Sequence, residues 1–367
     1  MKNNQLVLLD MVSGFLLLPL SILIRFLRKL FSKAIHIQYE GILIIKFLGA
    51  GNFIAIQDKI TGKNIDLVTA KSNEYVLKNF RFGRETYFID ESSFFNLFLS
   101  ASACCFKIFF KNYHQVINLE SESSFAKFLT SLTSAKILSG VSSSNKSYID
   151  YWLYDRYLVN PQMLNKIGLI SQLDRFHPVT NIYMKSAILE HCRQFDKSTL
   201  LHNIKTVTIS PSCSNTDNMR RLSNKDWNMA LSLLSKACGI EKIVAVFPNS
   251  MDSQFQSFVE MQSIYPSLDV RVTSYKEFID HIESADLLVT IDSQALHLRQ
   301  QFNKASIAFF GPTSPFGVNL TIATYPVTKA LVCSPCTHKY LRLPCENLGP
   351  CMNFDSNFLD VLLEINQ

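Results

Sequence analysis

The chain has 367 residues, of which 47% are hydrophobic and 18% charged, and its formal net charge is +6. A chain of this length is expected to form roughly two domains. The composition is too apolar for intrinsic disorder, and 12 Gly and 12 Pro without a short period exclude collagen-like architectures. The excess of Lys and Arg over acids is small for the length, so no nucleic-acid partner is expected.

Residues 1–40 predict a membrane-associating segment. The run 11–24 carries no charge but is short for a spanning helix, and no small-residue cleavage site follows it. From Leu23 onward one helix face is apolar and the other basic, with cations at Arg25, Arg28, Lys29 and Lys33. Such a helix suits the anionic cytoplasmic face of the inner membrane, so we expect peripheral or monotopic attachment. A helix buried on the first domain and a single span within residues 5–31 are the alternatives.

Residues 41–195 predict an α/β domain. Short apolar runs alternate with helix-length segments, which is typical of βαβ units in a parallel sheet. These runs cover residues 41–47, 65–70, 86–90, 114–119 and 135–141. Residues 150–204 are expected to be mostly helical, with a helix over 180–195 and an interdomain linker at 195–204.

Residues 205–330 repeat this pattern. The expected strands cover residues 206–210, 243–248, 269–273, 287–292 and 305–311. Two such domains predict a cleft that faces the carboxyl ends of both sheets, where ligands of these folds bind. Residues 331–367 form a Cys-rich tail that ends in a predicted short helix over 357–365.

The most informative stretch is residues 287–315. A buried strand delivers Asp292 to its carboxyl end, Ser293 is placed to cap the next helix, and His297 lies one turn into it. A helix N-terminus binds phosphate, and Asp292 is placed to bond sugar hydroxyls beside it. On the residues alone, a purely structural role is equally open for both residues: Asp292 as a helix cap and His297 as a core residue with its hydrogen bonds satisfied.

This stretch resembles glycosyltransferase family 9, the ADP-heptose:lipopolysaccharide heptosyltransferases, and the resemblance covers most of residues 41–352. The family pattern of Asp-Thr-Gly, two residues and His, followed later by Phe-Gly-Pro-Thr, stands here as Asp292-Ser293-Gln294, His297 and residues 310–313. Gln294 departs from the family's Gly.

The resemblance implies a GT-B arrangement of two Rossmann-like, doubly wound domains. In that arrangement the C-terminal half binds the donor and the N-terminal half binds the acceptor. Asp292, Ser293, Gln294 and His297 are then expected to bind the nucleotide sugar, with Asp292 positioning the donor sugar.

A second match lies in residues 210–227. The family has a Thr in this loop, a cation four residues on, and then a helix with Trp, and Thr216, Arg220 and Trp227 occupy these places. The resemblance implies that Thr216 and Arg220 hold the nucleotide phosphates, whereas the alternative is a solvated Arg pair at a helix start. Asp252 stands where family members often place an acid that bonds the ribose.

The third match is the first strand-to-helix turn, where the family uses a Gly-Asp pair and its Asp is the catalytic base. Here Gly49 and Gly51 mark the acceptor-side loop, and Asn52 replaces the Asp. An amide cannot take the proton. Asp58 is the nearest acid, roughly 9 Å farther along a helix. Three explanations remain open: another carboxylate is the base, the acceptor needs little activation, or the protein binds its ligands without turnover.

The nine cysteines, without a secretory cleavage pattern, predict reduced thiols. Cys333, Cys336, Cys345 and Cys351 have the spacing C-x2-C-x8-C-x5-C, which is a weaker zinc signal than two close pairs. A structural metal or redox pair and simple buried thiols are the two interpretations. No Asp-x-Asp motif occurs, so we expect neither a catalytic metal nor another cofactor.

These observations predict a metal-independent, inverting glycosyltransferase. It would move a heptose-like sugar from a nucleotide diphosphate, with ADP-heptose as the first choice, to a lipopolysaccharide core or related glycolipid. One alternative is a catalytically silent nucleotide-sugar or glycan-binding protein, because Asn52 replaces the base. A second is a membrane acyltransferase that uses His191 and Asp196, which form an H-x4-D pair.

Overall fold

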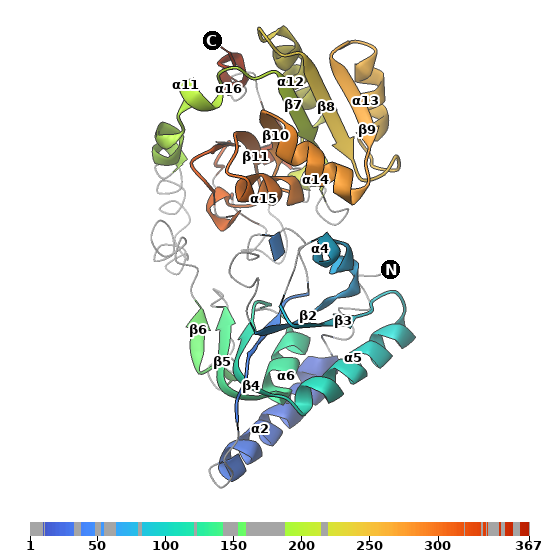
Figure 1. Ribbon diagram of the computed structural model, residues 1–367, viewed down its shortest axis with the longest axis vertical. Helices are drawn as coiled ribbons and strands as arrows, with labels where there is room; N and C mark the ends of the chain where they lie inside the picture. The colour runs from blue at the N-terminus through green and yellow to red at the C-terminus, as the bar shows by residue number, and fades with distance from the viewer. Residues whose placement is uncertain are drawn as a thin grey trace. The chain divides into compact units, whose positions relative to one another are not determined.

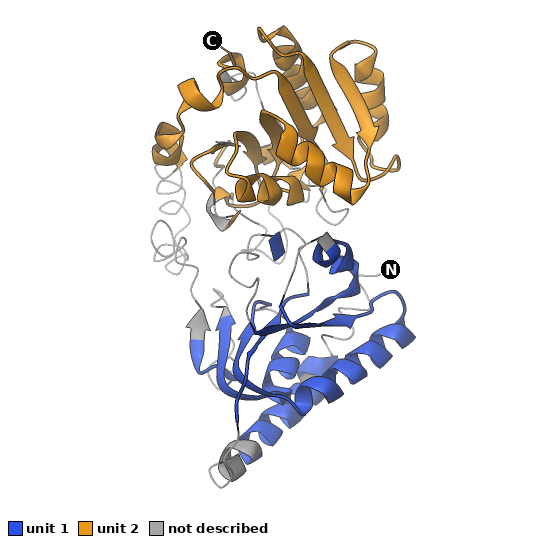
Figure 2. Ribbon diagram, in the orientation of Figure 1, with its two compact units in different colours: residues 1–160 blue, residues 161–367 orange. Residues whose placement is uncertain are grey.

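The chain forms two compact units, residues 1–160 (unit 1) and 161–367 (unit 2) (Figure 2). The computed structural model describes residues 10, 12–32, 38–47, 53–54, 64–79, 83–120, 123–141, 153–158, 188–213, 219–318, 320–331, 333–334, 336, 345, 349–354 and 360–366. The linker predicted at 195–204 is wrong in its position, because Phe195, Leu201 and Ile204 are buried in the core of unit 2.

Unit 1 is built on a parallel sheet with the strand order β3-β2-β1-β4-β5-β6. The five strands predicted from the sequence are present, and β6 lies in a segment expected to be mostly helical. The strands are β1 (Ile42–Ile45), β2 (Ile65–Ala70), β3 (Glu85–Ile89), β4 (Asn112–Asn118), β5 (Ser134–Val141) and β6 (Arg156–Leu158).

Two helices of unit 1 begin at serine caps. The Ser93 hydroxyl accepts from the Asn96 N–H at the start of α5, and the Ser123 hydroxyl accepts from the Ala126 N–H at the start of α6. The helical elements are η1 (Ser13–Leu17), α2 (Leu18–Ser32), η2 (Lys71–Asn73), α4 (Glu74–Asn79), α5 (Phe94–Phe109) and α6 (Ser124–Leu132) (Figure 1). No helix in the parts of the chain that the structure describes is long and apolar enough to cross a membrane.

Unit 2 repeats the architecture, with the parallel order β12-β11-β10-β7-β8-β9. The five predicted strands are confirmed, and β12 was not predicted. The strands are β7 (Thr206–Ser210), β8 (Lys242–Phe247), β9 (Leu268–Val272), β10 (Leu287–Ile291), β11 (Ser306–Phe310) and β12 (Thr324–Thr328). The helical elements are α11 (Lys197–Leu200), α12 (Asn224–Lys236), α13 (Phe255–Gln262), α14 (Tyr275–Ser284), α15 (Gln294–Gln301), η5 (Pro315–Val318), η6 (Pro350–Met352) and α16 (Asp360–Leu363).

Both sheets are doubly wound, which confirms the predicted α/β class with two Rossmann-like units. Central strands such as β10 and β11 are buried at every residue, because helices cover both faces of a parallel sheet, and this explains their continuous apolar runs. The strand order reverses between β1 and β4 in unit 1 and between β10 and β7 in unit 2. These switch points are where such folds bind ligands.

A buried acid joins the amino-terminal ends of three strands in unit 1. The Asp66 side chain in β2 is fully buried. Its carboxylate accepts two hydrogen bonds from Arg84 at 3.0 Å and one each from Lys111 Nζ and Tyr113 Oη, also at 3.0 Å. Burial alone raises the pKa of Asp66, but these hydrogen bonds outweigh it and hold the pKa below its ordinary value.

We expect Asp66 to make unfolding sensitive to acid. Its lowered native pKa stabilises the fold fully above the unfolded value of about 3.9, and this stabilisation is lost as the pH falls through the native pKa. Asp66→Asn should remove this part of the pH dependence. At neutral pH it should cost about 1–3 kcal/mol, since partly exposed Arg84 and Lys111 can turn to water.

Thermal unfolding of both proteins from about pH 3 to 7 measures this effect. Asp269→Asn is the matched control, because its ion pair with Arg271 is solvent-exposed and contributes at most about 1 kcal/mol. Parallel pH curves for the wild-type protein and Asp66→Asn would contradict the assignment.

Candidate functional site

Arg220 and Asp292 meet at the switch point of unit 2. Asp292 directly follows β10, and Arg220 precedes α12 after the loop that leaves β7. Arg220 Nη1 donates to the Asp292 backbone oxygen at 2.9 Å and lies 3.3 Å from Oδ2. The structure therefore brings together two residues that are far apart in the sequence and that sequence analysis selected separately.

Ser293 occupies the first position before α15, but its side chain does not cap the helix. Ser293 has extended backbone angles, and its hydroxyl lies 3.2 Å from Thr290 Oγ1. The Thr290 hydroxyl donates to the Ser210 carbonyl at 2.8 Å, which joins β10 to β7. The predicted capping role of Ser293 is therefore wrong, although its position at the helix start is confirmed. A helix start of this kind can bind an anion.

Gln294 stands where the family pattern has Gly, and its side chain points toward α14. Gln294 Nε2 donates to Tyr275 Oη at 2.6 Å, which links the first turn of α15 to the first turn of α14. A side chain anchored in this way fixes the orientation of the helix start beside Asp292.

His297 is buried next to this pair, and burial lowers its pKa, with Asp292 opposing and Arg220 adding to the effect. The imidazole is therefore neutral at physiological pH. Its Nδ1 atom and Thr313 Oγ1, after β11, are buried polar atoms without a hydrogen-bond partner among the described residues. Buried polar groups are nearly always paired. His297 is thus buried with an Nδ1 that has no hydrogen-bond partner among the described residues, and its role in donor binding stays a prediction.

The two adjacent arginines have different partners, so the predicted solvated Arg pair is wrong. Arg221 forms a buried two-pronged ion pair with Asp252, at 2.8 Å and 3.0 Å. Burial raises the pKa of Asp252, but hydrogen bonds from the Arg221 guanidinium and the Gln254 N–H outweigh this effect. The pKa of Asp252 is therefore below its ordinary value, and the carboxylate stays charged. Its ribose contact stays a prediction. Trp227 is fully buried in the core.

Unit 1 has its own ion pair at the corresponding switch point, which sequence analysis did not single out. Lys46 follows β1, and Glu120 follows β4. Lys46 Nζ donates to Glu120 Oε1 at 2.7 Å, and the Phe47 N–H donates to the same oxygen at 2.9 Å. The available signal was a charged residue at the end of each of two neighbouring apolar strands.

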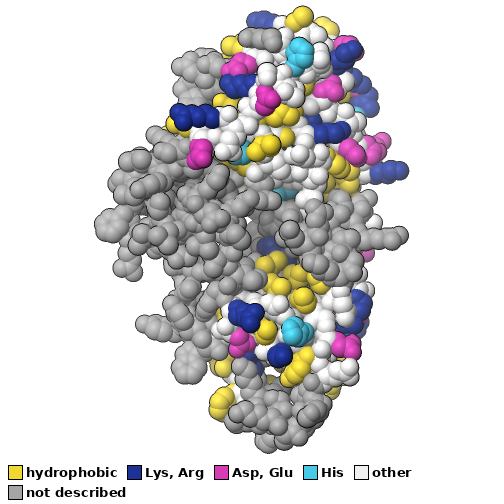
Figure 3. Space-filling model, turned by 60° about the vertical axis from the view of Figure 1, so that its left-hand side comes forward, with side chains coloured by type: hydrophobic (Ala, Val, Ile, Leu, Met, Phe, Trp, Pro, Cys, Tyr) yellow, Lys and Arg dark blue, Asp and Glu magenta, His cyan; other side chains and the backbone are white. Residues whose placement is uncertain are grey.

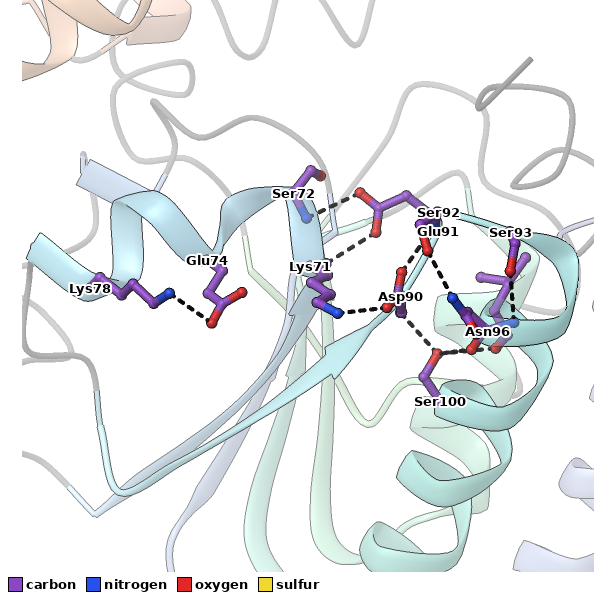
Figure 4. Close-up of polar contacts among 11 residues, drawn as sticks. Lys71, Ser72, Glu74, Lys78, Asp90, Glu91, Ser92, Ser93, Asn96 and Ser100 are labelled. Carbon is purple, nitrogen blue, oxygen red and sulfur yellow. Dashed lines mark hydrogen bonds and ion pairs between the residues drawn. The ribbon is translucent and has the colours of Figure 1, made fainter. Parts of the chain in front are cut away.

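Two further carboxylates follow β3, which β2 separates from β1. Glu91 accepts from the backbone N–H groups of Lys71 and Ser72, both at 3.1 Å (Figure 4). Asp90 accepts from Lys71 Nζ at 2.7 Å, and hydrogen bonds from Lys71 and Ser92 lower its pKa to about 2. These acids hold the start of η2.

Six residues that sequence analysis discussed lie outside the described residues: Lys33, Gly49, Gly51, Asn52, Asp58 and Thr216. Their expected roles at the membrane, on the acceptor-side loop and at the donor phosphates stay predictions.

The C-terminal cysteines gather near the end of β11. Cys336 and Cys351 are buried, and Cys333 and Cys345 are partly exposed. Burial first, and the neighbouring Cys336 next, raise the pKa of the Cys351 thiol to about 11. Within the described ranges, no three His, Cys, Asp or Glu side chains form a group able to hold a metal ion.

The H-x4-D pair considered for acyl transfer is not assembled. His191 is buried, and its Nε2 lies 3.0 Å from the Thr324 carbonyl oxygen. Asp196 instead caps α11 by accepting from the Thr199 N–H at 3.2 Å. Each residue has a structural role of its own.

No family model matches the sequence, and no curated protein matches it. Solved structures match in fold. Escherichia coli heptosyltransferase WaaC with ADP-2-deoxy-2-fluoro heptose has a TM-score of 0.54 at 14% identity, with 89% of this chain and 99% of that chain covered. E. coli ADP-heptose lps heptosyltransferase II has a TM-score of 0.52 at 13% identity, with 89% and 97% covered.

A glycosyl transferase of family 9 from Veillonella parvula is also similar. Its TM-score is 0.51 at 14% identity, with 80% of this chain and 86% of that chain covered. At these identities the likeness establishes the two-unit fold, which is the fold that the sequence resemblance implied.

Proposed function

We propose that the protein is a glycosyltransferase that moves a heptose-like sugar from a nucleotide diphosphate to a lipopolysaccharide core or related glycolipid. The observation that carries this proposal is the group at the switch point of unit 2, where Arg220, Asp292 and the unpartnered Nδ1 of His297 converge. The solved structures similar in fold include one with ADP and one with a fluorinated ADP-heptose, which supports ADP-heptose as the first donor to test.

In this proposal the donor diphosphate lies between Arg220, Thr216 and the helix start at Ser293. A guanidinium and helix N–H groups are suited to an anion, since both present fixed hydrogen-bond donors. Asp292 and neutral His297 bind the sugar hydroxyls, one as an acceptor and the other through Nδ1. Asp252 is the candidate for a hydrogen bond to the ribose of the nucleotide.

The reaction is an in-line displacement. The acceptor hydroxyl oxygen attacks the anomeric carbon and forms the glycosidic bond. The bond from that carbon to the phosphate oxygen breaks, and the nucleoside diphosphate leaves with the electron pair. One displacement inverts the anomeric configuration. Arg220 and the N–H groups at the start of α15 carry the leaving charge, so we propose that transfer needs no metal ion.

The acceptor proton needs a base other than Asn52, and we propose Glu120. Glu120 stands at the switch point of unit 1, after β4, the strand next to β1, whereas Asp90 and Glu91 follow the more distant β3. Lys46 and the Phe47 N–H fix its orientation through Oε1. A carboxylate held in a fixed orientation is suited to accept the proton as the acceptor oxygen attacks.

The acceptor class also places the reaction at a membrane. A lipopolysaccharide precursor is held by its lipid in the inner membrane, and we propose that the protein acts at the cytoplasmic face, attached peripherally through residues 1–40. A binding protein without turnover is the alternative that Asn52 keeps open. Incubation with labelled nucleotide sugars and truncated acceptors separates the two, because only a transferase moves label into the lipid.

A further inference from the structure

Two helices of unit 1 expose large apolar side chains. Apart from Tyr75, all the exposed large hydrophobic residues described in unit 1 lie on η1, α2 and α5 or directly beside them. They are Val12, Leu16, Leu20, Leu23, Phe26 and Leu27 at the N-terminus, and Phe94, Phe95, Phe98, Leu99, Phe106 and Phe110 on and after α5. We call these twelve side chains the apolar face.

Unit 2 provides the contrast. Its exposed hydrophobic residues, such as Met251, Ile264 and Ile322, are scattered along the sequence. On the side of unit 2 seen in Figure 3, Lys, Arg, Asp and Glu side chains alternate. Scattered apolar residues among charges are typical of an ordinary solvated surface, whereas a contiguous patch marks an interaction site.

Helix α5 is apolar on both sides. Its inner face buries Leu97, Ala101, Cys104 and Ile108 against the sheet. On the outer side Phe95, Phe98 and Phe106 are 61–68% exposed. A helix on a water-exposed surface carries polar residues on its outer face, and a helix that is hydrophobic all round is covered on all sides. Among the residues that the structure describes, none therefore covers the outer face of α5.

Helix α2 carries most of its large apolar side chains on its outer side. The inward side of η1 and α2 is mostly small or polar, with Leu18 as its buried apolar residue. Gly14 lies close to the start of α6, Ser21 hydrogen-bonds Ser131, and Arg25 pairs at 3.0 Å with Asp155, which precedes β6. The opposite side carries the leucines of the apolar face. In water the apolar side of a helix faces the protein. Small and polar contacts inward with hydrocarbon outward are typical of helices that contact lipid.

The charges around the apolar face favour an anionic lipid surface over a protein partner or a second copy. No Asp or Glu occurs in residues 11–39 or 92–119. The cations in these two stretches are Arg25, Arg28, Lys29, Lys33, Lys107 and Lys111. Arg25 and Lys111 are paired with acids of unit 1, and Lys107 is exposed at the end of α5. Cations beside an apolar surface are attracted to anionic headgroups.

We propose that α2 and α5 together form a lipid-binding surface, so that α5 enters the headgroup region beside the N-terminal helix. Both helices pack against α6, and Figure 1 shows them on the same side of the unit 1 sheet. The membrane contact thus extends beyond residues 1–40 into the folded unit itself. The inference does not depend on sugar transfer, because vesicle binding is measured without donor or acceptor.

The test is flotation of the full chain with vesicles of phosphatidylcholine alone and of phosphatidylcholine with phosphatidylglycerol. We expect binding to both, and tighter binding to the anionic vesicles. The triple variant Phe95→Gln, Phe98→Gln, Phe106→Gln should lower the partition coefficient by at least about tenfold, because three apolar side chains leave the lipid. The matched control is Met251→Gln, Ile264→Gln, Ile322→Gln, which should bind as the wild-type protein does.

A second measurement places each helix directly. Trp introduced as Phe98→Trp or Leu20→Trp should be quenched by bromine-labelled lipids to a similar extent, whereas Ile264→Trp should not. Wild-type vesicle binding by the α5 triple variant, or no quenching of Phe98→Trp, would overturn the proposal. A chain that is dimeric in solution, and that the triple variant makes monomeric without weakening lipid binding, would assign the face to a second copy instead.

Discussion

Arg220→Ala is expected to lower kcat for sugar transfer by about 10²- to 10³-fold, the usual loss when one donor to a developing anion is removed. The effect should fall on kcat more than on KM, because the phosphate oxygen that leaves gains charge only as the bond to the sugar breaks. Initial rates with saturating acceptor and varied donor measure both constants.

Arg220→Lys is the graded variant. It keeps the charge but loses the planar guanidinium whose Nη1 contacts Asp292, so it should retain part of the activity. Arg271→Ala, at an exposed surface cation, serves as the matched control and should leave kcat unchanged. Wild-type kcat in Arg220→Ala, with its folding intact by thermal unfolding, would remove Arg220 from the leaving-group role.

Glu120→Gln is expected to lower kcat by about 10²- to 10⁴-fold, since it removes the general base and leaves a side chain of the same shape. The Gln carbonyl oxygen can still accept from Lys46 Nζ and the Phe47 N–H, so the local structure should be kept. Donor affinity, which we assign to unit 2, should not change. Single-turnover rates together with donor-binding calorimetry separate the two effects.

Asp90→Asn is the control for Glu120→Gln, because it makes the same change of charge at the same edge of the sheet. A sharper test adds Asn52→Asp to Glu120→Gln, which returns the family's base and should recover part of the lost rate. Unchanged kcat in Glu120→Gln would show that another group, or none, takes the proton.

The sequence predicts the sheets well because strands such as β10 and β11 are buried on both faces and read as unbroken apolar runs. It misses β6 and β12 at sheet edges. β6 is only three residues long, and β12 contains Pro326, which demotes a strand pattern. The linker was misplaced because Phe195 ends a predicted helix and residues 196–203 are mostly polar, so the sequence does not reveal that Phe195 and Leu201 are buried in unit 2.

The candidate site was predictable only in part. Asp292, Ser293 and His297 follow one strand, so their proximity follows from local geometry. The contacts of Arg220 with Asp292 and of Arg221 with Asp252 depend on how loops of different strands fold back, which spacing in the sequence does not encode. Lys46 and Glu120 meet because β1 and β4 are adjacent in the sheet, although β2 and β3 lie between them in the sequence.

Transfer of isotope from ADP-heptose to truncated lipopolysaccharide is the most direct test of the central claim. The detergent-solubilised wild-type protein is incubated with labelled donor and acceptor, with and without a metal chelator, and the lipid is recovered and counted. We predict label in the lipid, one ADP released for each sugar moved, and the same rate with the chelator present. Tight binding of intact donor without transfer, with activity appearing only in Asn52→Asp, would contradict the account and identify a nucleotide-sugar-binding protein.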